Sequence, residues 1–114
     1  MSLQAFVDRI YSEPEAIAFD ETIAAIDRHF DFTPTAFSVG EQHNGEGSNL
    51  GSCKILAFGH LMNLPEPTTL HLFGDYFRVD VLQHPDGDDH QNIRQFLRHG
   101  WRGVSFKQIP LKAK

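Results

Sequence analysis

Residues 85–101 read PDGDDHQNIRQFLRHGW, and this stretch carries signals for both ends of a helix. Asp88 followed three residues later by Gln91 has the spacing of a capping box, which predicts that the helix starts at Asp88. Apolar residues then recur at helical spacing and form one buried face. They are Ile93, Phe96 and Leu97. Gly100 suits the left-handed backbone that ends a helix, so the sequence predicts a helix between a tight turn and this glycine.

The same helical spacing of apolar residues occurs in four segments upstream. These segments are residues 3–11, 19–30, 52–62 and 67–82. Ser2, Asp20 and Ser52 are candidate N-caps for the first three, and Pro67 suits the first turn of the fourth. Prolines follow or interrupt each pattern, which separates the segments. The sequence therefore predicts five helices.

Extended structure is predicted for residues 35–39, which are rich in aromatic and β-branched side chains. We expect them to pair with residues 103–107, and residues 109–111 are a second candidate partner. Residues 40–51, GEQHNGEGSNLG, hold four glycines and two asparagines, which predicts a long, mobile loop. The predicted fold class is α+β, mainly helical, with one domain over residues 1–114 and a small β-element.

The chain of 114 residues is long enough for one domain with its own core. Its net charge of −5 argues against a general nucleic-acid-binding protein. The longest uncharged stretch, residues 55–65, is about half of a membrane span, and no signal-peptide pattern stands at the N-terminus. The single cysteine, Cys53, excludes an internal disulfide and favours a reducing compartment. We expect a cytoplasmic protein that does not enter a membrane.

Positive charge is concentrated in the last part of the chain. Residues 1–50 hold nine acids and two Lys or Arg, whereas no acid follows Asp89. The bases that follow are Arg94, Arg98, Arg102, Lys107, Lys112 and Lys114. A candidate binding surface for an unidentified protein or an acidic small ligand comprises Arg94, Arg98, Trp101 and Arg102. The alternative is that these arginines pair with acids inside the fold.

Three segments resemble the HopJ family, which is named after a bacterial type III secreted effector. They are FDFTPTAFSVGE (30–41), NLGSCKILAFGHL (49–61) and GDYFRVDVLQHPDGDDHQNIRQFLRHGWRGVSF (74–106). The family has no agreed enzyme activity, so the resemblance implies a small, non-catalytic binding or interaction protein of bacterial type. Translocation into a host cell is expected only if the resemblance extends to effector function.

Cys53 supports an alternative function as the nucleophile of a hydrolase or transferase. It follows a glycine-rich loop at the predicted start of a helix, where backbone N–H groups stabilise a thiolate. His84 or His90, later in the chain, would be the catalytic base. The competing interpretation is a small apolar side chain in the core.

A second alternative is a metal site in the turn at residues 84–90, HPDGDDH, where two histidines and three aspartates occur together. His84, Asp86 and His90 are the candidate ligands of a divalent metal, completed by a residue from another segment. Apart from this metal no cofactor is expected. The competing interpretation is a turn followed by a helix N-cap, which uses the same acids structurally.

Overall fold

The structure is a computed structural model that describes residues 2–114. Within this range the α-helices are α1 (Leu3–Ser12), α2 (Phe19–His29), α3 (Leu50–Leu61), α4 (Glu66–His71) and α5 (Gln91–His99). Shorter helical segments are η1 (Pro14–Ala16), the π-helix η2 (Tyr76–Val81) and η3 (Gly100–Gly103). The strands are β1 (Phe30–Phe32), β2 (Phe37–Val39), β3 (Gln42–Asn44), β4 (Val104–Phe106) and β5 (Leu111–Ala113). The predicted α+β, mainly helical class is confirmed. None of the described helices is long and apolar enough to span a membrane.

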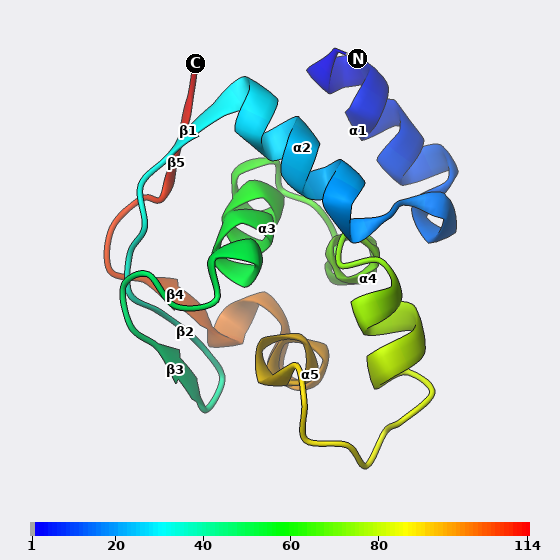
Figure 1. Ribbon diagram of the computed structural model, residues 1–114, viewed down its shortest axis with the longest axis vertical. Helices are drawn as coiled ribbons and strands as arrows, with labels where there is room; N and C mark the ends of the chain where they lie inside the picture. The colour runs from blue at the N-terminus through cyan, green and yellow to red at the C-terminus, as the bar shows by residue number, and fades with distance from the viewer. Residues whose placement is uncertain (1) are drawn as a thin grey trace.

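Helix α3 lies at the centre, with α1, α2 and α4 on one side and the strands on the other (Figure 1). Its middle residues, from Ile55 to Gly59, are all buried. A helix that is apolar around its whole circumference belongs inside a protein, and α3 carries one charged residue, Lys54, near its start. A Cβ on Gly59 would lie 2.9 Å from the Thr69 side chain, so glycine allows α4 to pack closely against α3.

Two small antiparallel sheets cover the other side of α3. The predicted pairing of residues 35–39 with 103–107 is confirmed, because Phe37 pairs with Phe106 and Val39 with Val104. The loop prediction for 40–51 is wrong at residues 42–44, which form β3 and pair with β2 after a tight turn at Gly40. The pairing of residues 109–111 with this sheet is also wrong, since β5 pairs with β1 instead.

The fourth predicted helix is broken into two. Gly74 has a φ of +63°, and its α-carbon lies against α2 so closely that a Cβ would come within 2.6 Å of the Phe19 nitrogen. The chain therefore ends α4 at His71 and resumes as η2 at Tyr76. Helical spacing alone did not reveal this break, because the apolar residues keep their period across it.

Three predicted helix starts also differ. Helix α5 begins at Gln91 with His90 left-handed at φ 50°, so the Asp88 capping box does not form. Helix α3 begins at Leu50, after a left-handed Asn49, rather than at Ser52. Helix α2 begins one residue before Asp20, and the Glu21 carboxylate accepts a hydrogen bond from the Ala18 N–H.

Candidate functional site

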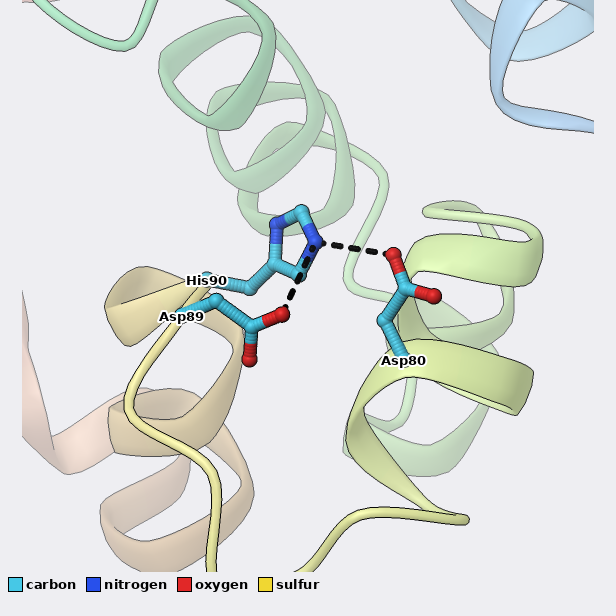
Figure 2. Close-up of side chains that lie close together, drawn as sticks. All are labelled: Asp80, Asp89 and His90. Atoms are coloured by element: carbon cyan, nitrogen blue, oxygen red, sulfur yellow. Dashed lines mark hydrogen bonds and ion pairs between the residues drawn. The ribbon is translucent and has the colours of Figure 1, made fainter.

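A histidine and two aspartates meet between η2 and the start of α5 (Figure 2). The Nε2 atom of His90 lies 3.0 Å from Oδ2 of Asp80 and 3.8 Å from Oδ2 of Asp89. One ligand atom from each residue lies within 4.8 Å of the other two. Among residues 2–114, this is the one group of three or more His, Cys, Asp and Glu with such spacing. The His90 side chain is 29% exposed, so the cluster is partly buried but accessible to solvent.

Arg94 fixes the two aspartates relative to each other. Its guanidinium donates to the backbone carbonyls of Asp80 (3.1 Å), His84 (2.8 Å) and Asp89 (2.6 Å). It also donates to Oδ1 of Asp89 at 2.5 Å. The side chain of Arg94 is only 10% exposed, although the loop that it holds is exposed. One arginine thus holds both ends of residues 80–89 and leaves Oδ2 of Asp89 facing His90.

The ring of His90 is oriented by aromatic contacts. It lies 5.0 Å from the ring of Tyr76, and Tyr76 in turn meets Phe19 edge to face at 5.0 Å. His90 has a left-handed backbone, which is uncommon for residues other than glycine. Together these features direct Nε2 of His90 towards the carboxylates on η2 and on the preceding residue.

A cavity of about 410 Å³ lies beside His90, where the segment from β3 to the start of α3 approaches the start of α5. Its lining comes from this segment and from residues around α2, η2 and α5: Phe19, Gln42, Asn49, Gly51, Ser52, Phe73, Tyr76, Asp88, His90, Gln91, Asn92 and Ile93. Three asparagines hold this segment against α5. Asn44 and Asn92 exchange side-chain hydrogen bonds of 2.9 and 3.0 Å, and Asn49 donates to Asn44 at 2.7 Å.

The cluster carries two carboxylates, one of which is paired with Arg94. The hydrogen bond from Arg94 lowers the pKa of Asp89, which favours the ionised, metal-binding form of this carboxylate. Two donor atoms at tetrahedral positions about 2.0–2.1 Å from zinc lie about 3.3 Å apart. The distances of 3.0 and 3.8 Å from Nε2 of His90 bracket this value. Nitrogen and carboxylate ligands suit zinc or manganese better than calcium.

The sequence-predicted metal ligands are only partly brought together. His90 belongs to the cluster, but His84 and Asp86 do not contribute to it and both side chains are exposed. His84 takes part through its backbone carbonyl, which Arg94 binds. The reason is the chain reversal at residues 85–88: the turn projects its own side chains outward and places the residues on its two sides together.

Cys53 is 1% exposed and belongs to the hydrophobic core. Burial raises the pKa of its thiol, and the Thr35 backbone opposes this only partly. Because α3 begins at Leu50, the N–H of Cys53 already donates to Asn49 O at 3.1 Å inside the helix. These surroundings suit a packed thiol. They do not favour the hydrolase hypothesis, in which Cys53 is the nucleophile and His84 or His90 is the catalytic base.

The predicted arginine surface divides into two parts. Arg94 is engaged within the fold, as the alternative interpretation has it, whereas Arg98 and Arg102 are exposed. Trp101 is half-buried: its Nε1 donates to Leu64 O at 3.0 Å, and its ring meets Phe96 edge to face. Arg94 is thus not free to bind a partner, and Trp101 offers only part of its ring.

Sequence reasoning missed Asp80 and Asp89 as members of the cluster and Tyr76 as the neighbour of His90. A signal was present for Asp80. The turn predicted at residues 85–88 reverses the chain, and Asp80 and His90 stand on either side of it. Residues placed in this way become neighbours across the turn, as the 3.0 Å contact shows.

Comparisons with known proteins agree with this fold. A family model described as "HopJ type III effector protein" matches residues 3–111. The crystal structure of "unknown function protein VPA0580" is 49% identical and superposes with a TM-score of 0.98, covering 100% of this chain and 95% of that one. A search of curated proteins found no match.

Proposed function

The chain belongs to the HopJ family, and on that premise we propose that it is a small, non-catalytic binding protein whose ligand is a divalent metal ion held by Asp80, Asp89 and His90. The observation that carries the proposal is the convergence of three ligand atoms within 4.8 Å of one another. The burial of Cys53 supports the non-catalytic interpretation, because a buried thiol of raised pKa is a poor nucleophile.

The support around these ligands resembles that of metal sites. Carboxylates that bind a metal are themselves hydrogen-bonded, and such partners orient them. Arg94 does this for Asp89 through Oδ1 and fixes the backbone at Asp80. Water molecules would complete the coordination, as in sites with three protein ligands. The competing interpretation is a simple ion pair between His90 and the two aspartates.

Isothermal titration of the untagged protein with Zn²⁺ tests the proposal. We expect one equivalent to bind, and Asp80→Asn and His90→Gln each to weaken binding about a hundredfold, because a ligand lost costs at least as much as its supporting partner. Circular dichroism would show that both variants remain folded, since the side chains lie at the surface.

His84→Gln and Asp86→Asn are the matched controls, because both residues lie in the same loop and outside the cluster. We expect them to bind Zn²⁺ like the unaltered protein. Absence of saturable binding, or equal losses in the controls, would show that His90 forms only an ion pair.

A further inference from the structure

A second surface lies on the opposite side of the central helix from η2, where the chain runs from η3 to β5 (Figure 1). It is a groove of about 660 Å³ lined by Ala57, His60, Leu61, Trp101, Val104, Ser105, Phe106, Lys107, Gln108, Ile109, Pro110 and Leu111. None of these side chains is a carboxylate. The groove shares no residue with the cluster around His90, so the two sites are separate.

The groove exposes apolar surface that the fold leaves uncovered. Ile109 is 83% exposed and Leu61 is 48% exposed, in a lining that also includes Trp101 and Phe106. Single exposed apolar residues need no explanation, but several along one groove mark an interaction site. Strand β4 adds hydrogen-bonding capacity, because it is the last strand of the order β3-β2-β4 and pairs on one edge only within residues 2–114.

The cations at this groove form no ion pair within residues 2–114. Lys107 lines the groove, and Arg102 is the sequence neighbour of the lining residue Trp101. Arg9, Lys54, Arg78 and Arg94, by contrast, all form ion pairs. The charges of Lys107 and Arg102 are therefore available to a ligand of the groove.

We propose that this groove binds an extended, acidic segment of a partner protein, which pairs with the free edge of β4 and inserts an apolar side chain between Leu61 and Ile109. An extended segment suits an unpaired strand edge, and its alternate side chains supply the specificity. Carboxylates on the segment complement the positive charges of Lys107 and Arg102.

A second copy of this chain fits less well. Seven of its fifteen acids lie in helical segments, as Asp8, Asp20 and Asp80 do, and a helix cannot pair with a strand edge. The densest remaining group, Asp86, Asp88 and Asp89, lies in the turn before α5 and is not an extended segment. The charge pattern thus selects an acidic partner, and the strand edge selects an extended one.

Selection from a library of short random peptides displayed on phage tests the proposal without a known partner. We expect selection to enrich peptides rich in Asp and Glu with one aromatic or aliphatic anchor. Enriched peptides are then synthesised and measured by fluorescence anisotropy. Ile109→Glu and Lys107→Glu should each weaken binding about tenfold or more, because they place a negative charge where the peptide's anchor and carboxylates lie.

Leu97→Glu and Arg98→Glu are the matched controls, since both residues are exposed on α5 and outside the groove. They make the same changes of charge, and we expect binding to stay within about twofold. No enrichment, enrichment of neutral or basic peptides, or equal losses in the controls would overturn the proposal. A dimer in sedimentation that Ile109→Glu abolishes would show that a second copy is the occupant. Peptide binding that persists in the presence of EDTA would show that the groove acts independently of the proposed metal site.

Discussion

Arg94→Met should destabilise the protein more than the exposure of the loop that Arg94 holds suggests. The guanidinium donates to three backbone carbonyls, of Asp80, His84 and Asp89, and holds residues 80–89 in one conformation. A net contribution of about 1 kcal/mol for each of these bonds gives a loss of about 2–3 kcal/mol. The carboxylate of Asp89 is left out of this estimate because water screens an exposed ion pair. Methionine keeps the apolar stem, so the change isolates the hydrogen bonds.

Urea and thermal unfolding measure this loss directly. For a domain of this size, about 2–3 kcal/mol corresponds to a fall in Tm of roughly 8–12 °C. Arg98→Met is the control, because Arg98 is exposed on the same helix and forms no ion pair within residues 2–114, and it should stay within about 0.5 kcal/mol. Zn²⁺ affinity should fall about tenfold in Arg94→Met, since the ligands lose their support. Equal stabilities of the two variants would refute the role assigned to Arg94.

Three further results are expected. Iodoacetamide should modify Cys53 only as fast as the protein unfolds, because burial raises its pKa; a rapid reaction with an inflection below about 8.5 would contradict this. Burial lowers the pKa of His71, so an NMR titration should show this side chain protonating below its ordinary pKa. The stability that neutral His71 contributes is present above about pH 6.5 and is lost as the pH falls through the lowered pKa, and His71→Gln should remove this pH dependence of the unfolding free energy. Gly74→Ala should lower the free energy of unfolding by more than about 2 kcal/mol, because its Cβ would meet the backbone of Phe19. Gly47→Ala is the control: Gly47 also has a positive φ but no atom within 4 Å of the added Cβ, so the loss should be about 1 kcal/mol of backbone strain, and similar losses in the two variants would contradict this explanation.

Much of the fold could be predicted from the sequence because its signals are local. Apolar spacing identified the helical segments, and the β-branched and aromatic residues 35–39 identified the strand that pairs with β4. The errors fall where contacts between distant segments decide the backbone. Gly74 breaks a helix because α2 lies against it, and the Asn44 side chain at the end of β3 bonds to Asn92 on α5.

The candidate site was predicted less well than the fold. The turn at 84–90 was singled out for its ligand-type side chains, and His90 of this turn lies in the cluster. The other members of the cluster differ from those expected, because proximity in sequence favoured His84 and Asp86 over Asp80. The predicted arginine surface divides for a similar reason. Helical spacing puts Arg94 and Arg98 on one face of α5, but only the Arg94 side chain reaches the backbone carbonyls of the preceding loop, and Arg98 stays exposed.

The sequence by itself determined the mainly helical α+β class, the pairing of its first sheet and the excess of positive charge near its end, since these depend on residue types and on spacing over a few positions. Tertiary structure alone decided which aspartates meet His90 and which cations stay unpaired. A turn that reverses the chain brings Asp80 to 3.0 Å from His90, and distances of this kind depend on left-handed residues and backbone hydrogen bonds that no periodicity encodes.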